Sequence, residues 1–194
     1  MHHVFVIVLG MISIVGLTFI VERGLALRWR TVIPPAVEAA AGACTSPKDL
    51  PKLAQVCEQN PSPISRLLVA AHAHKNWPRE DNIDALQISA RHEVTRLERG
   101  LVVLEIVVGI GPLLGLVGTI AGLIILFSAV GLDGLTDSHR VAEGIATALQ
   151  ATLAGLLTAI PSLIAWSYYN KKVETLAVEM ETICDKFIRQ LYRT

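Results

Sequence analysis

The stretch GPLLGLVGTIAGLIILFSAVG, residues 111–131, decides the fold together with GIATALQATLAGLLTAIPS, residues 144–162, which follows after a short polar break. Both segments are long and apolar, so we expect two membrane helices joined by a hairpin. A helix that faces only lipid has no use for so many Gly, Ala and Thr residues. Small residues let helix backbones approach closely, and hydroxyls hydrogen-bond across the contact. The two helices are therefore predicted to pack against each other.

The composition also favours a membrane protein, since 52% of the 194 residues are hydrophobic. Residues 4–21 carry no charge. At about 1.5 Å per residue they form about 27 Å of helix, which is close to a bilayer core of about 30 Å. A cleaved signal peptide is the alternative, but no small-residue cleavage site precedes Glu22 and Arg23. The prediction is an all-α membrane protein with three transmembrane helices and helical cytoplasmic extensions.

The distribution of positive charge predicts the topology. Residues 22–100 contain 11 Lys and Arg and residues 170–194 contain 5, whereas the hairpin tip contains only Arg140. Because Lys and Arg concentrate on the cytoplasmic side, we expect the N-terminus and the tip outside and the C-terminus inside. The predicted segments are a first membrane helix at 1–21, a cytoplasmic helical region at 22–100, a second membrane helix at 101–130, the tip at 131–143, a third membrane helix at 144–169 and a cytoplasmic C-terminal helix at 170–194.

Both cytoplasmic regions are predicted to be helical. No Gly or Pro occurs from about residue 81 until Gly100, so a helix is expected to run without interruption into the second membrane helix. In the tail, apolar residues recur at three- and four-residue spacing on one face. They are Val173, Leu176, Ala177, Met180, Ile183, Phe187, Ile188 and Leu191. Two interpretations of this face stay open: the core of a helix bundle, and a contact with a neighbouring subunit.

The sequence gives little support for nucleic-acid binding, metal binding or catalysis. With 17 basic and 17 acidic residues the chain has no overall attraction to nucleic acid. Cys44, Cys57 and Cys184 lack CxxC spacing and are expected to be inert thiols. His72 and His74 are too close for a metal site on one helix face and are expected to be solvated. No HExxH or GxSxG motif is present, so we expect no enzyme, metal site or cofactor.

The two hairpin motifs resemble the signature of the MotA/TolQ/ExbB proton channel family, and VERGLALRWRTVIPP, residues 21–35, is similar to the ExbB/TolQ branch. The resemblance implies a subunit of a homopentameric ring in the bacterial inner membrane, with a periplasmic tip. The ring is expected to surround a single-span ExbD/TolR-like dimer that carries an aspartate. The transported H⁺ or Na⁺ takes the place of a cofactor. Three spans, rather than four, favour ExbB/TolQ over MotA.

The resemblance also implies an ion pathway, because the threonines of GLVGTIAG and LQATLAG line it in the family; here they are Thr119 and Thr152. Thr147, which we include in the pathway, stands where proton-driven members usually have glutamate. Sodium-type members tend to have a second threonine where this chain has Ala151. A hard cation such as Na⁺ needs several oxygen ligands, so one hydroxyl fewer favours H⁺. A hydroxyl cannot take up and release a proton as a carboxylate does, so the partner's aspartate is expected to supply that group.

Glu105 is the only charged residue within the predicted helices 4–21, 101–130 and 144–169. It is either an acid at the inner mouth of the ion path or a carboxylate at headgroup level that bonds a neighbouring helix. Pro112 and Pro161 are expected to kink their helices, because proline removes a backbone donor. The residues expected at the helix contact are all small: Gly115, Gly118, Gly122, Gly144, Ala148, Ala151, Gly155 and Ala159.

The predicted function is an ion-conducting stator subunit. It couples inward cation flow, H⁺ in preference to Na⁺, to rotation of the partner dimer and mechanical work on the cell envelope. The alternative is a non-conducting membrane scaffold for a single-span partner.

Overall fold

A computed structural model describes residues 2–44, 49–133 and 138–192, and helices are the only regular secondary structure within these ranges. Three helices are long and apolar enough to cross a membrane. They are α1 (His2–Ala26), α7 (Leu101–Asp133) and α8 (Ser138–Leu191). Residues 134–137 of the predicted tip lie outside the described residues, and the flanking helices extend into the range 131–143 from both sides.

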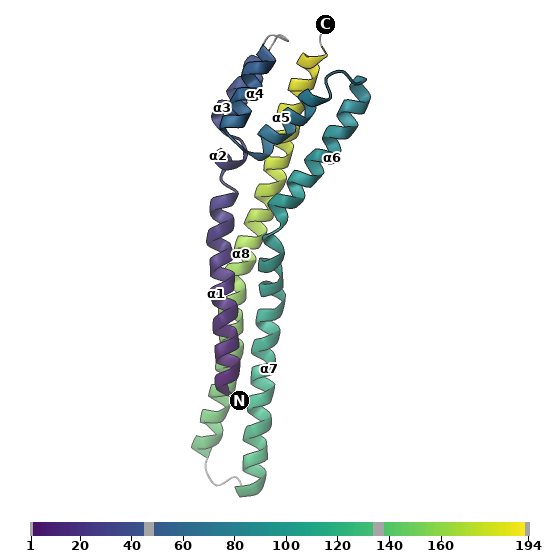
Figure 1. Cartoon of the computed structure of the whole chain (residues 1–194). Coiled ribbons are helices and arrows are strands. Elements are labelled where there is room, and N and C mark those ends of the chain that lie inside the picture. Colours follow the sequence, from purple (N-terminus) through teal and green to yellow (C-terminus); the bar gives the residue numbers. More distant parts are fainter. Residues whose placement is uncertain (1, 45–48, 134–137, 193–194) are drawn as a thin grey trace. The chain divides into compact units, whose positions relative to one another are not determined.

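The chain divides into two compact units. The membrane unit comprises residues 1–22 and 100–168, and the bundle unit comprises residues 23–99 and 169–194. In the membrane unit α1, α7 and α8 lie side by side (Figure 1). A Cβ added at Gly16 of α1 would meet Ser162 Oγ of α8 at 3.1 Å and Val107 Cγ1 of α7 at 3.4 Å. The small residue at this position therefore lets α1 pack onto both other helices.

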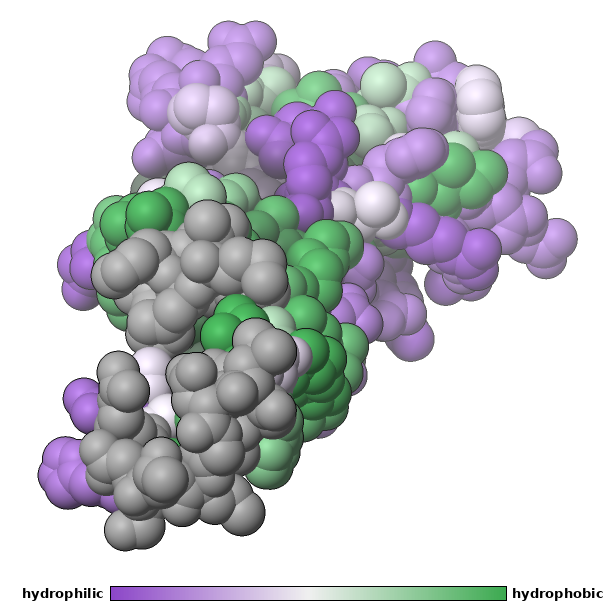
Figure 2. All heavy atoms as spheres, turned by 90° about the horizontal axis from the view of Figure 1, so that it is seen from below, coloured by the Kyte–Doolittle hydropathy of each residue, from purple (hydrophilic) through white to green (hydrophobic). Residues whose placement is uncertain are grey.

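The outer surface of the membrane unit is apolar. Leu113 and Ile124 on α7 and Leu157 on α8 are each more than 60% exposed. Figure 2, which looks along the helices, shows hydrophobic residues gathered in a continuous exposed patch. Such a surface is unfavourable in water and suits the hydrocarbon core of a bilayer.

The bundle unit is built from five shorter helices and the last part of α8. The five are α2 (Trp29–Val32), α3 (Pro35–Ala43), α4 (Leu50–Gln59), α5 (Pro63–Ala73) and α6 (Arg79–Glu98). Proline occupies the first turn of α3, α4 and α5, where its missing N–H costs no helical hydrogen bond. Ser62 caps α5, because its Oγ accepts a hydrogen bond from the Ser65 backbone N–H at 3.3 Å.

The apolar face of the tail lies in the core of this bundle. Leu176, Met180 and Phe187 of α8 are at most 1% exposed within the single chain. They share the core with Leu67 and Leu68 of α5, which are equally buried. Of the two interpretations of this face, the structure supports the helix-bundle core.

Polar contacts also join α5, α6 and the end of α8. Glu93 of α6 is buried and accepts hydrogen bonds from Arg66 of α5, at 2.9 Å from Nε and 2.5 Å from Nη2. The Asn82 side-chain amide donates to the Tyr192 hydroxyl at 3.0 Å. That hydroxyl in turn donates to the Trp77 carbonyl at 3.0 Å. The C-terminal end of α8 is thereby tied to the turn between α5 and α6.

The structure corrects one expectation about the helices. The helix predicted to run into the second membrane helix is interrupted, because α6 ends at Glu98 and α7 begins at Leu101. A turn at Arg99 and Gly100 separates them. Glycine costs a helix about 1 kcal/mol relative to alanine, so a single Gly100 is a suitable place for the break.

The histidines and the cysteines of the bundle unit differ in how far they are buried. His72 and His74 are half-buried, and the His74 ring stacks on Trp77 with centroids 4.0 Å apart, so the expectation of solvated histidines is wrong. The three thiols are buried and free, as inert thiols would be. Burial raises the pKa of each, and raises that of Cys184 to about 12.

Candidate ion-pathway site

The site is built on the contact between α7 and α8, where two backbones touch. A Cβ added at Gly155 would lie 2.6 Å from the carbonyl oxygen of Gly111 and 3.1 Å from Cα of Gly115. A Cβ added at Gly115 would lie 2.9 Å from the carbonyl oxygen of Ala151. Real Cβ atoms do not approach backbone atoms this closely, so these positions accept only glycine unless the helices separate. We call the contact of Gly111, Gly115 and Gly155 the glycine crossing.

The other small residues predicted for the contact continue along the same pair of helices. A Cβ added at Gly122 would lie 3.1 Å from Cβ of Ala148, and one added at Gly144 would lie 2.6 Å from Cδ1 of Leu126. The remaining three are buried: Gly118, Ala151 and Ala159. Because the residues along this contact have small side chains or none, polar atoms of α7 can reach α8.

Two hydroxyls and two carbonyls meet beside the glycine crossing. Thr119 Oγ1 and Thr152 Oγ1 share a hydrogen bond between the helices. Thr119 Oγ1 also lies 3.0 Å from the carbonyl oxygen of Ala148 and 3.2 Å from that of Gly115. Thr152 Oγ1 lies 3.3 Å from the Gly115 carbonyl oxygen. We call these four atoms the oxygen cluster; it brings together the two threonines that the sequence singled out.

The oxygen cluster has more acceptors than donors. Each hydroxyl has one hydrogen, yet the two hydroxyls face each other and two carbonyls. Two hydrogens cannot make all of these close contacts into hydrogen bonds at once. The spare lone pairs can accept from a protonated carboxyl or coordinate a hard cation. The cluster holds no group that changes charge near neutral pH. It can therefore orient a proton donor or a cation but needs a carboxylate from elsewhere to hold a proton.

Thr147 does not join the oxygen cluster. Its hydroxyl donates to the carbonyl of Glu143, 2.9 Å away in the same helix. At 3.6 residues per turn, the step of five residues from Thr147 to Thr152 places the two side chains about 140° apart around the helix, so the two threonines are on different faces. Thr158 likewise donates within α8, to the Ala154 carbonyl at 3.0 Å.

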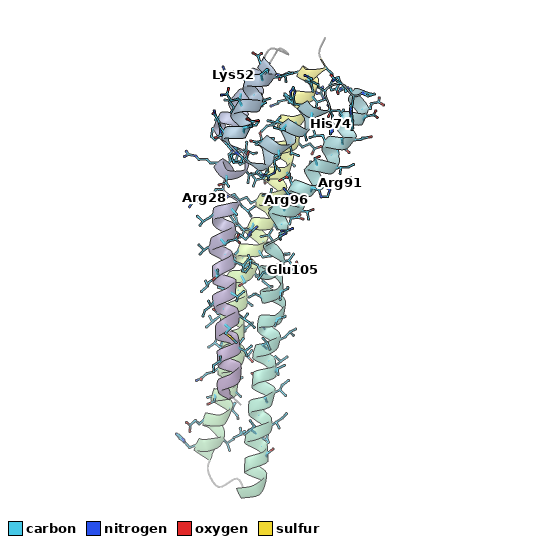
Figure 3. The ribbon with its side chains drawn as sticks, viewed as in Figure 1. Arg28, Lys52, His74, Arg91, Arg96 and Glu105 are labelled. Atoms are coloured by element: carbon cyan, nitrogen blue, oxygen red, sulfur yellow. The ribbon has the colours of Figure 1, made fainter. Side chains whose placement is uncertain are left out.

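Glu105 is exposed and lies near the start of α7 (Figure 3). It precedes Thr119 by 14 residues, which is about 21 Å along a helix. Its carboxylate makes no hydrogen bond or ion pair with the described part of this chain. Glu105 is thus apart from the oxygen cluster, and a contact for it would have to come from another molecule or from the membrane surface.

Pro112 and Pro161 each lie inside a continuous helix, α7 and α8 respectively. Proline has no backbone N–H, so the carbonyls of Val108 and Leu157, four residues earlier, lose their usual helical donor. Both helices nevertheless continue through the prolines. Each proline is close in sequence to a residue of the small-residue contact, Gly111 or Ala159.

Comparison with known proteins identifies the family. Residues 59–182, more than half of the chain, match the model of the MotA/TolQ/ExbB proton channel family. The chain belongs to this family. The prediction made from the two hairpin motifs is confirmed, and with three helices able to cross a bilayer the chain is a multi-pass membrane protein.

Relatives in the family come from the ExbB/TolQ branch. The Tol-Pal system protein TolQ of Pseudomonas aeruginosa is 29% identical over 195 residues, which cover 93% of this chain and 83% of that protein. The biopolymer transport protein ExbB of Helicobacter pylori is 34% identical over 97 residues, covering 50% of this chain and 62% of the relative. A putative ExbB-like protein of Synechocystis is 31% identical over 165 residues, covering 80% and 63%. The chain therefore matches about three fifths of the length of the latter two.

Sequence reasoning within the family pattern missed the carbonyls of Gly115 and Ala148, which complete the oxygen cluster. It also missed Ser162, whose buried side chain donates to the Thr158 carbonyl at 3.0 Å and adjoins Gly16. A signal for both carbonyls was present, because each carbonyl belongs to the residue four positions before one of the two threonines, where a helical threonine hydroxyl usually donates. Only the position of one helix on the other places each carbonyl beside the threonine of the opposite helix as well.

Proposed function

We propose that this chain is an ion-conducting stator subunit of an ExbB/TolQ-like motor. Five copies form a ring around a single-span ExbD/TolR-like dimer, and inward cation flow drives rotation of that dimer and mechanical work on the cell envelope. The observation that carries the proposal is the oxygen cluster, two threonine hydroxyls and two carbonyls held together inside a contact of otherwise small residues.

The partner supplies the charged group in this mechanism. Its membrane aspartate meets Thr119 and Thr152, takes up a proton from one side and releases it to the other. The hydroxyls stabilise both states, because they donate to a carboxylate and accept from a carboxylic acid. H⁺ is preferred to Na⁺, since Ala151 provides no further hydroxyl for a hard cation.

The proposed orientation follows the distribution of Lys and Arg. The N-terminus and the tip between α7 and α8 face the periplasm, and the bundle unit lies in the cytoplasm of a bacterial cell, next to its inner membrane. In this orientation Glu105 is near the inner end of the second span, where an exposed acid can attract cations toward the path.

The experiment is ion flux in proteoliposomes that contain this chain and its single-span partner, under separate H⁺ and Na⁺ gradients. Thr152→Val removes one hydroxyl of the oxygen cluster with little change in shape. We expect the flux to fall at least about tenfold, which corresponds to the loss of about one hydrogen bond to the passing ion. Thr158→Val is the matched control, because Thr158 donates only within its own helix, and it should conduct at the wild-type rate.

The outcomes separate the two functions under consideration. Flux that follows H⁺ and is lost in Thr152→Val supports the stator. Flux that follows Na⁺ retains the stator and overturns the ion preference. An intact complex that conducts neither ion favours a non-conducting scaffold for the partner.

A further inference from the structure

The bundle unit has an open groove with a volume of about 780 Å³ between α6 and α8. Most of its apolar lining comes from one face of each of these two helices, at positions three, four, seven, eight or eleven residues apart. These residues are Ile83, Leu86, Ala90 and Val94 on α6, and Ala177 and Ile188 on α8; Leu67 of α5 also lines the groove. The two alanines keep the walls low, so the groove is suited to a helix, as in helix-in-groove recognition.

The groove carries one charge on each wall that this chain does not pair. Arg91 lines the α6 wall (Figure 3) and Glu181 the α8 wall, and neither forms an ion pair within the described residues. Asp185, further along the α8 wall, is already bonded to Arg189 at 2.8 Å. Both charges are exposed. An occupant that brings apolar atoms for the floor and a cation would pair Glu181, while Arg91 stays in contact with solvent.

A second face of α8, about 120° further round the helix than the groove lining, presents a ridge with these properties. Val178, Thr182 and Lys186 follow one another at four-residue spacing and so form one line along the helix. Val178 is 62% exposed, which is unfavourable for an apolar side chain in water. Lys186 is exposed and forms no ion pair within the part of the chain that the structure describes.

We propose that the groove binds the α8 ridge of a second copy of this chain. The groove and the ridge are different surfaces, so the contact is heterologous, and repetition around an axis closes a ring. The inference rests on the proposed ring of identical subunits and specifies the surfaces that join them.

Such a ring gives one of the two groove charges, Glu181, a partner. When copies are related by rotation about an axis parallel to α8, each residue lies at the same height along that axis in every copy. Lys186 of one copy is then five residues further toward the C-terminal end of α8 than Glu181 of the next copy. That is about 7.5 Å along the helix axis, a distance that the long, flexible Lys186 side chain can bridge to the neighbouring carboxylate. Val178 meanwhile falls at the level of Ala177 in the neighbouring groove.

Cross-linking between two differently tagged copies tests the contact in intact membranes. One copy carries Ala90→Cys in the groove and the other Val178→Cys on the ridge, both in full chains with Cys184→Ala, because Cys184 lines the groove. Oxidation should yield a disulfide-linked product that carries both tags. Ile88→Cys paired with Val178→Cys is the control, since Ile88 is 61% exposed on α6 but does not line the groove.

Charge reversal provides a second test on the same cross-link. Glu181→Lys alone, and Lys186→Glu alone, should each lower the cross-linking yield about twofold to fivefold, the range expected for an exposed ion pair. The two changes together should restore the wild-type yield, which a variant that merely misfolds would not do. A double variant as weak as the singles would overturn the pairing of these charges.

Failure of the groove contact can be distinguished from failure of the ring. If the two tags purify together but the groove and ridge cysteines give no more product than the Ile88 control, the groove is not the contact and the ring stands. If the two tags do not purify together at all, the ring fails, and the proposed groove contact fails with it.

Discussion

The membrane unit and the bundle unit hold their helices together in opposite ways. At the glycine crossing α7 and α8 approach because side chains are missing, and Gly155 has no room for even a Cβ. In the bundle unit α8 is held by large side chains, among them Phe187 and Met180, which are 1% exposed. One continuous helix, α8, takes part in both arrangements.

The difference reflects the solvent that each unit meets. In water, burial of apolar area stabilises by about 25 cal/mol per Å², so large side chains are the effective means of packing. Lipid tails are as apolar as leucine, so in a membrane helices associate through close backbone contact and hydrogen bonds. The same small residues that allow this contact also let the Thr119 and Thr152 hydroxyls meet, so the packing of the membrane unit creates its candidate site.

The largest loss of stability is expected from a substitution in the bundle unit. Phe187→Ala removes a buried aromatic side chain and leaves a cavity, which should lower the free energy of unfolding by about 3–5 kcal/mol. Thermal unfolding of the purified full chain in detergent measures it. Ile88→Ala, at a residue 61% exposed, is the control and should stay within about 0.5 kcal/mol of wild type. Equal effects at the two positions would mean that α8 is not held by its apolar core.

The next effect is expected at the glycine crossing, where adding atoms rather than removing them should be harmful. Gly155→Ala should lower the free energy of unfolding by about 1–3 kcal/mol, because the new methyl group meets the Gly111 carbonyl. It should also disturb ion flux by separating Thr119 from Thr152. At Gly109 an added Cβ meets nothing within 4 Å, so Gly109→Ala should be neutral or stabilising by up to about 1 kcal/mol. A stabilising Gly155→Ala would refute the close contact.

The smallest effect concerns pH and should be confined to the bundle unit. Burial lowers the pKa of His72 from 6.5, and the positive charge of nearby Lys75 lowers it by a smaller amount. The unfolded chain then binds a proton more readily than the folded one, so the contribution of His72 to stability is intact above pH 6.5 and decreases as the pH falls below it. His72→Gln should therefore reduce the loss of thermal stability between pH 7 and pH 5. The oxygen cluster contains no such group, so Thr152→Val should leave this dependence unchanged; identical pH profiles of wild type and His72→Gln would exclude the effect.

Much of this arrangement could be predicted from residue patterns. Length and hydropathy predicted three membrane-length helices, the GLVGTIAG and LQATLAG motifs predicted the family, and the tail's spacing predicted an apolar face on α8. The tail left two interpretations open, because periodicity shows that a face will be covered but not by what. Burial of Leu176 and Phe187 within the single chain supports the bundle core. The break at Gly100 was missed because a single glycine is only a weak helix breaker.

What the sequence by itself determined is therefore the identity of the helices, their small-residue faces and the two threonines at the centre of the family motif. Only the tertiary structure decided which atoms surround those threonines. It placed each hydroxyl beside a carbonyl of the opposite helix, Thr119 beside Ala148 and Thr152 beside Gly115. The reason is physical: spacing along one helix sets the face on which a side chain lies, whereas a contact between helices far apart in sequence depends on where their backbones touch.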